Sequence, residues 1–261
     1  MIRRRLYVEE RMSRLAAWSL RLALFALPVA ALAVALFWLE VLDFRAAIRT
    51  LLAGLGISAL ALLLATAGFA VMWQEGLRGL GRVVGAAALA LLLLLPAAGV
   101  YALGSRMPPL HDVSTDTDDP PRFEALGFAR SRAANPLAPP DAATADMQAD
   151  AYPDVKPIEF DATPDEIYNA LVALVGRYKW RIIDAVPPRG GLRDGRIEAT
   201  TRSLPFGLRA DIVIRVRPSA AGVRVDMRSV SREGDTDFGQ NARRISTLIA
   251  DLSDERGRRR R

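Results

Sequence analysis

The stretch "ADIVIRVRPSAAGVRVDMRSVSREGDTDFGQNARRI", residues 210–245, contains two alternating segments followed by a helical one. Hydrophobic residues occupy every second position on both sides of "PSAAG". This alternation predicts two antiparallel strands, at Asp211–Arg217 and Val223–Ser231, joined by a turn. Beyond them, helical spacing predicts a helix from about Asp237 to Ser253. Its apolar face holds Phe238, Ile245, Leu248, Ile249 and Leu252.

The sequence before this stretch shows the same two patterns. Residues Thr163–Glu166 read "TPDE", a capping box with proline at the first helical position, and apolar residues follow at helical spacing. Alternation predicts strands at Trp180–Val186 and Arg196–Ser203, with a short strand at Ile158–Phe160. The order α-β-β-β-β-α predicts a small α+β domain over residues 155–254, with an antiparallel sheet and helices on one face.

One face of the predicted sheet is strongly charged. If Ile212 and Ile214 point toward the helices, the opposite face receives charged side chains from neighbouring strands. These are Arg196, Glu198, Arg202, Arg215, Arg217, Arg224, Asp226, Arg228 and Arg232. The pattern is compatible with a solvated surface, with an anion-binding surface and with a dock for an acidic segment.

Three uncharged hydrophobic runs precede the domain, at Leu22–Leu39, Thr50–Trp73 and Val83–Ser105. Each approaches or exceeds the roughly 20 residues that cross a bilayer core, and the first outlasts the hydrophobic region of a signal peptide. The sequence therefore predicts three transmembrane helices within residues 1–106. Charged residues are absent from all three runs, which argues against a transporter or channel.

The arginines flanking these runs predict an orientation. Arg3, Arg4, Arg5, Arg11 and Arg14 precede the first run, and two more arginines lie between the second and third, at Arg78 and Arg82. The loop between the first and second runs holds two, Arg45 and Arg49. Positive residues favour the cytoplasmic side, so we expect a multi-pass protein with a cytoplasmic N-terminus. In a Gram-negative cell this means the inner membrane, with the C-terminal domain in the periplasm.

Residues 107–154 form a proline-, alanine- and aspartate-rich arm between the two parts, and residues 255–261 form a basic tail. The arm contains "HDVSTDTDDPPRF", an acidic, turn-forming segment. We expect it to dock on the sheet or on the corner around residues 231–241, where several ion pairs together would hold it. The docking residues expected are Asp112, Ser114, Thr115, Asp116 and Phe123.

Composition excludes several classes of function. The net charge of +6 does not come from the domain and its arm: residues 106–261 hold 25 Lys and Arg against 24 acids. This balance argues against a nucleic-acid partner. The chain has no cysteine and one histidine, His111, which excludes disulfides, thiolate chemistry and a multi-histidine metal site. The sequence predicts no cofactor and no metal.

The corner between the last strand and the last helix holds the candidate site. Asp235 and Asp237 are N-cap candidates, and their spacing to Asn241 does not fit a calcium loop. Arginines beside a helix N-terminus suit a phosphate or carboxylate. The candidate ligand-binding residues are Arg228, Ser229, Ser231, Arg232, Asp235, Asp237, Asn241 and Arg244.

Four segments resemble one family: "HDVSTDTDDPPRF", "AYPDVKPI", "IVIRV" and "VDMRSVSREGDTDFGQNARRI". From about Leu110 to Leu252 the chain is similar to the domain of unknown function 1499. The resemblance implies a bacterial domain placed behind membrane helices or an export signal, with no established activity. Many members of that family carry two acids before the "IVIRV" strand, whereas this chain has Ala210 followed by Asp211.

Three functions remain open at this point. We expect a non-enzymatic envelope module whose partners are the lipid bilayer and an anionic or lipidic ligand or an envelope protein. A hydrolase would use Ser229 or Ser231 as nucleophile with His111 as base, and the sequence identifies no catalytic group beyond that pair. A structural subunit of a membrane complex would use the hydrophobic runs as its interface.

Overall fold

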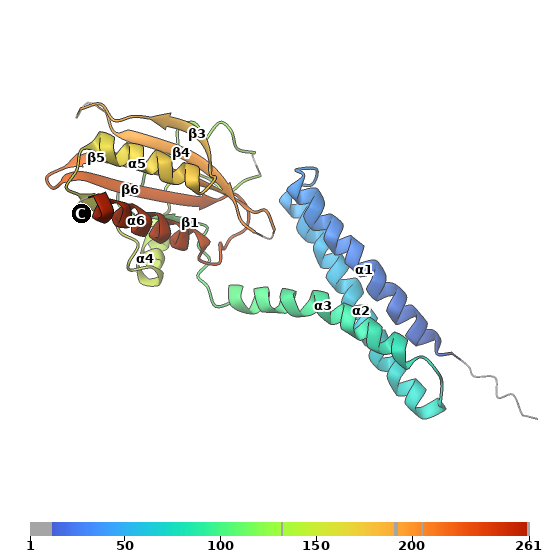
Figure 1. The fold of residues 1–261 in the computed structure, drawn as a ribbon. Helices are drawn as coiled ribbons and strands as arrows, with labels where there is room; N and C mark the ends of the chain where they lie inside the picture. Colours follow the sequence, from blue (N-terminus) through green and yellow to red (C-terminus); the bar gives the residue numbers. More distant parts are fainter. Residues whose placement is uncertain (1–11, 132, 191–192, 205, 260–261) are drawn as a thin grey trace, which may run out of the picture. The chain divides into compact units, whose positions relative to one another are not determined.

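The computed structural model describes residues 12–131, 133–190, 193–204 and 206–259 (Figure 1). Arg3, Arg4, Arg5 and Arg11, which carry much of the predicted orientation, and the last two residues of the basic tail lie outside the described residues. The chain divides into two compact units, Met1–Leu103 and Gly104–Arg261.

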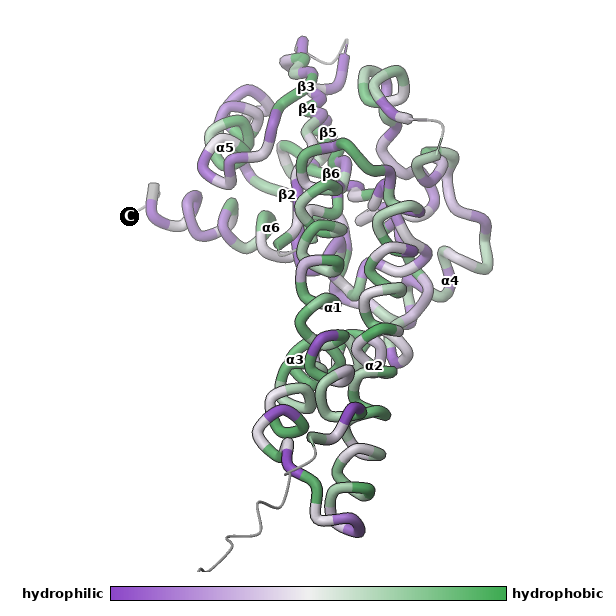
Figure 2. The backbone as a smooth tube through the Cα atoms, turned by 90° about the vertical axis from the view of Figure 1, so that its right-hand side faces the viewer, coloured by the Kyte–Doolittle hydropathy of each residue, from purple (hydrophilic) through white to green (hydrophobic). Residues whose placement is uncertain are grey.

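The first unit consists of three helices, α1 (Arg14–Trp38), α2 (Phe44–Glu75) and α3 (Leu80–Gly104). All three are long and apolar enough to cross a membrane, and hydrophobic residues predominate along them (Figure 2). The predicted helical, membrane-type N-terminal part is therefore confirmed. Small residues let the first two helices approach closely: a Cβ on Gly54 would lie 3.4 Å from the backbone nitrogen of Ala30.

The second unit is built on an antiparallel sheet with the strand order β1-β6-β5-β4-β3, in which β2 also pairs with β6. Its strands are β1 (Asp112–Ser114), β2 (Ile158–Phe160), β3 (Arg181–Val186), β4 (Gly195–Arg202), β5 (Arg209–Ser219) and β6 (Gly222–Ser231). Its helices are α4 (Ala142–Ala151), α5 (Pro164–Arg177) and α6 (Gln240–Arg259). The predicted α+β fold is confirmed, and β1 and α4 are additions to the predicted elements.

Helices α5 and α6 cover one face of the sheet (Figure 1). The core lies between these two helices and the sheet, where the apolar strand residues meet the apolar helix faces. Fully buried members include Ile197, Ile212, Ile214, Met227, Leu171, Leu174, Ile245 and Leu248. Thr163 and Glu166 form the capping box that starts α5. The end of α6 extends beyond the predicted helix and includes part of the basic tail.

The opposite, charged face of the sheet is covered by the arm. Strand β1 extends the sheet beside β6, with Asp112 opposite Val230. Thr115 exchanges two hydrogen bonds with Met227, through its backbone N–H and its side-chain oxygen. Gln148 of α4 exchanges two with the backbone of Ser114. The arm thus adds strand β1 to the sheet and forms the layer that covers its charged face.

Charged side chains join the arm to this face. The carboxylate of Glu198 is fully buried and accepts the backbone N–H groups of Glu124, Ala125 and Leu126. Asp116 pairs with Arg224 and Arg217 at the edge of the same face. Burying a charge is costly unless it is paired and hydrogen-bonded, and here each acid has several donors. The charged face is therefore an internal layer of the fold.

A backbone detail at the end of α5 positions two aromatic rings. The helix closes with hydrogen bonds from Lys179 N–H to Gly176 and from Trp180 N–H to Val175. In such a terminus the residue after the cap is left-handed and is usually glycine. Lys179 occupies that position with φ of 57°.

Replacing Lys179 by glycine should raise the free energy of unfolding by about 0.5–1 kcal/mol. The left-handed conformation costs a residue with a Cβ about 1–2 kcal/mol, and the greater freedom of glycine in the unfolded chain offsets about 0.4–1 kcal/mol of that gain. Denaturant unfolding of the full chain in detergent measures the difference. The matched control is Lys179→Ala, which keeps the Cβ and should not stabilise. Equal effects of both variants would contradict a backbone origin.

Candidate functional site

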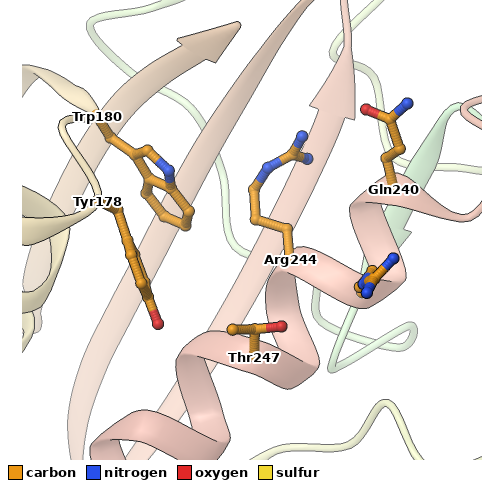
Figure 3. A pocket seen from close by; sticks show the side chains of 6 residues that line it. Tyr178, Trp180, Gln240, Arg244 and Thr247 are labelled. Carbon is orange, nitrogen blue, oxygen red and sulfur yellow. The ribbon is translucent and has the colours of Figure 1, made fainter. Parts of the chain in front are cut away.

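A cavity of about 340 Å³ lies between the start of β3 and the first turns of α6 (Figure 3). Two elements supply its walls: the α5–β3 connection contributes aromatic rings and α6 contributes polar side chains. The lining residues are Tyr178, Trp180, Gln240, Arg243, Arg244 and Thr247. We call this site the Arg244 cavity. Its volume lies at the lower end of the range for small-molecule sites, about 300–1,000 Å³.

The aromatic wall is held in place from behind. The rings of Tyr178 and Trp180 are 5.2 Å apart between centroids. The hydroxyl of Tyr178 donates to the carboxylate of Asp251. Burial raises the pKa of Tyr178, and the hydrogen bond to Asp251 adds to that rise, so the phenol stays neutral. The indole nitrogen of Trp180 lies on the side of the ring that faces Arg244 (Figure 3).

The opposite wall is cationic. Arg244 donates from Nη1 to Ser229 Oγ at 2.8 Å and to Asn241 Oδ1 at 2.6 Å. Burial lowers the pKa of Arg244 to about 10, so its guanidinium remains charged at neutral pH. Among the residues that the structure describes, no carboxylate lies within ion-pair distance of Arg243 or Arg244, although the charge of the nearby Asp237 raises the pKa of Arg244 and so partly offsets the effect of burial. The cavity therefore has a positive wall whose charge is incompletely offset.

Asn241 fixes the position of Arg244. This fully buried side chain donates from Nδ2 to the carbonyl of His111 and to Ser231 Oγ, each at 3.0 Å. Its Oδ1 accepts the hydroxyl of Ser229 as well as Arg244. All the hydrogen-bonding capacity of the amide is thus used to join the start of α6 to β6 and to the residue before β1.

Asp237 lies in the turn that precedes α6, and its side chain caps that helix. Its carboxylate accepts the N–H groups of Gly239 at 2.8 Å and Asn241 at 2.5 Å. Burial raises the pKa of Asp237, and these hydrogen bonds partly offset that effect. Phe238 and Gly239 both have positive φ, which explains why α6 begins at Gln240 rather than at the predicted Asp237. Asp235 is exposed and stands apart from this cap.

The structure brings the predicted nucleophiles and His111 into one region. The backbone N–H of Ser231 donates to the carbonyl of His111 at 2.8 Å, although the two are distant in sequence. The hydroxyls of Ser229 and Ser231 both bond Asn241. Within the described part of the chain, the imidazole of His111 has no hydrogen bond to either serine, and the hydroxyls serve to position α6.

The remaining predicted ligand residues lie on the other face of the sheet. Arg228 donates to both oxygens of Asp112, with Nη2 2.6 Å from Oδ2, and stands 5.6 Å from the ring of Phe123. Arg232 donates to Asp211 from Nε and Nη2. The predicted set is therefore divided: Ser229, Ser231, Asp237, Asn241 and Arg244 gather around the start of α6, and Arg228 and Arg232 serve the buried layer under the arm.

Five residues of the cavity lie outside the predicted site set: Tyr178, Trp180, Gln240, Arg243 and Thr247. Part of the signal was present in the sequence, because positions 240, 244 and 247 follow helical spacing on one face of α6. The aromatic wall had no such signal, since its placement depends on the left-handed residue between the rings. Among the described residues, no cluster of three or more His, Cys, Asp or Glu side chains suits a metal ion.

Comparison with known protein families gives a match. Residues 112–252 match the family described as "Protein of unknown function (DUF1499)". Neither a curated protein nor a solved structure matches the chain. The matched residues run from β1 to α6 and so include the sheet, its arm and the Arg244 cavity. The chain belongs to the domain of unknown function 1499 family.

Proposed function

We propose that this protein is a membrane-anchored, non-enzymatic binding module whose C-terminal domain lies outside the cytoplasm and binds a small anionic ligand in the Arg244 cavity. One observation carries the proposal. The cavity combines an incompletely offset guanidinium with an aromatic wall, in a chain that has three apolar helices of membrane-spanning length.

Every polar group of the cavity can donate a hydrogen bond, and the two guanidinium groups and the indole can only donate. Arg243 and Arg244 present guanidinium groups, Trp180 an indole N–H, and Gln240 and Thr247 an amide and a hydroxyl. Carboxylates and phosphates accept such bonds, and charge-assisted bonds to arginine are the stronger ones. Few convergent polar groups beside apolar walls are typical of ligand sites. The chemistry of this site therefore favours an anion with an apolar or planar part.

The arrangement around the cavity favours binding over catalysis. Ser229 donates its proton to Asn241 and accepts a hydrogen bond from Arg244, so its oxygen is positioned as part of a scaffold. An activated nucleophile needs a base within hydrogen-bonding reach, and the amide of Asn241 is not a base. We therefore place the binding module ahead of the hydrolase.

Binding is tested with glycerol 3-phosphate as the probe and the full chain in detergent. Arg244→Met should weaken binding roughly tenfold or more, because it removes a charge-assisted contact. Arg189→Met is the matched control: it removes an exposed arginine from the connection between β3 and β4. Isothermal titration gives both affinities. Equal affinities for the two variants would contradict a site at Arg244.

Cysteine labelling tests the topology separately. Because the sequence has no cysteine, an introduced cysteine provides the one thiol that can react. We expect Ala220→Cys, in the exposed β5–β6 turn, to react with a membrane-impermeant maleimide in intact spheroplasts. Gln74→Cys, near the end of α2, should react only after lysis. The reason is the arginine asymmetry: seven flank the side assigned to the cytoplasm and two flank the other. The reverse labelling pattern would overturn the orientation.

A further inference from the structure

We infer that the ligand of the Arg244 cavity is the phosphate headgroup of a membrane lipid, bound while its acyl chains remain in the bilayer. This rests on the proposed function and specifies its ligand class. Three properties of the second unit carry it: where the chain enters the domain, which side chains are exposed near the cavity, and how large the cavity is.

The chain from α3 enters the domain at the end where the cavity lies. Thr236 donates from its hydroxyl to the carbonyl of Pro108 at 3.2 Å, and Asp237 N–H donates to Leu110 at 3.0 Å. The cavity begins a few residues further on, at Gln240. Since α3 ends at Gly104, an extended chain of about 3.3–3.6 Å per residue limits the distance from Gly104 to Pro108 to roughly 14 Å.

This limit is about twice the thickness of one headgroup layer of a membrane. The bilayer is about 40–45 Å thick with its headgroups and about 30 Å without them, which leaves roughly 5–8 Å of headgroup layer on each side. If α3 spans the bilayer, this short connection keeps Pro108 within roughly 14 Å of the end of the helix. On this inference, the connection brings lipid phosphates within reach of the cavity at high local concentration.

Exposed apolar side chains occur at the same end. Leu204 is 82% exposed and Phe206 is 37% exposed, both in the connection between β4 and β5. That connection adjoins the cavity, because Ser203 and Leu208 line a second, smaller pocket together with Arg244. Apolar side chains beside arginine suit the boundary between headgroups and acyl chains.

The volume of the cavity bears on which part of a lipid it binds. The site is an open hollow of about 340 Å³, near the lower limit for small-molecule sites, and this size suits a headgroup with its glycerol better than two acyl chains. The phosphate would accept from Arg244 and Arg243, and the glycerol would lie against the rings. The apolar chains stay in the bilayer, where no desolvation cost arises.

The test uses the full chain in mild detergent, with native mass spectrometry of bound lipid. The probes are a phosphatidylglycerol, a phosphatidylcholine of the same acyl chains, and glycerol 3-phosphate as a soluble competitor. We expect retention of phosphatidylglycerol to exceed that of phosphatidylcholine, and to fall roughly tenfold in Arg243→Met and in Arg244→Met. Arg189→Met should behave as the unmodified protein. Arg243 is exposed, so its variant remains informative if Arg244→Met fails to fold.

The outcomes separate this inference from the proposed function. Binding of glycerol 3-phosphate that depends on Arg243 or Arg244, without retention of phosphatidylglycerol, would overturn the lipid source and leave the anion site standing. Retention of phosphatidylglycerol that neither variant changes would place the lipid elsewhere and overturn the inference. If neither probe binds, both the inference and the anion-binding function fail.

Discussion

Replacing Arg228 by methionine should lower the free energy of unfolding of the second unit by about 3–5 kcal/mol, the cost of breaking a buried ion pair from one side. Arg228 is fully buried and lies in the middle of the layer between sheet and arm. It donates to both oxygens of Asp112 and to the carbonyls of Leu137 and Ala138. Methionine fills the space but leaves the Asp112 carboxylate buried without its cation.

Arg224→Met is the matched control for this substitution. Arg224 lies on the same strand and the same face as Arg228, and it pairs with Asp116 and Asp226. Its side chain is partly exposed, and Arg215 also pairs with Asp226, so its loss should cost at most about 1 kcal/mol. Denaturant unfolding in detergent, followed by circular dichroism, measures both. Equal losses would show that the burial of Arg228 does not matter.

Adding Asp112→Leu to Arg228→Met should recover part of the loss. Replacing a buried pair by apolar residues of similar size is often nearly neutral, because the desolvation cost of both charges disappears. Recovery should be incomplete, since the carbonyls of Leu137 and Ala138 still lose their donor. A double variant no more stable than Arg228→Met would contradict an ion-pair origin of the loss.

The regular part of the fold was predictable because its signals are local. Alternation marks β5 and β6, and "TPDE" marks the start of α5, and the structure has all three near the predicted positions. Strand β1 was not predictable in this way. Of its three residues, Asp112–Ser114, only Val113 favours strands, and the segment becomes a strand by pairing with β6.

The ion-pair partners on the charged face of the sheet are not encoded locally in the sequence. Side-chain parity placed Arg228 and Arg232 on one face of the sheet, but their partners could not be inferred. Asp112 is 116 positions from Arg228, and the arrangement depends on how the arm crosses the sheet. The surroundings of Arg244 were likewise only partly predictable. Its place beside a helix start was visible in sequence, and the aromatic wall opposite depended on a left-handed Lys179.

Glu198→Gln should lower the free energy of unfolding by about 2–3 kcal/mol, although the side chain keeps its shape. One carboxylate oxygen accepts Glu124 N–H at 2.7 Å and Ala125 N–H at 3.2 Å, and the other accepts Leu126 N–H at 2.7 Å. An amide has one acceptor, so its NH₂ group must face an N–H group in a buried site. The ion pair with Arg196, 3.1 Å away, is lost as well.

The stability loss in Glu198→Gln should be confined to the contact between the arm and the sheet. This would distinguish it from destabilisation of the whole unit. Hydrogen exchange at the amides of residues 124–126 should accelerate before exchange in β5 and β6, because those amides lose their acceptor while the sheet ladders persist. Glu159→Gln is the control, since Glu159 is exposed on β2 and should change stability by less than about 0.5 kcal/mol. Unchanged protection at residues 124–126 in Glu198→Gln would show that the arm is held to the sheet by other contacts. The buried arginine pairs of β6 would then be the anchors, and Glu198 would be one acid among several on the face.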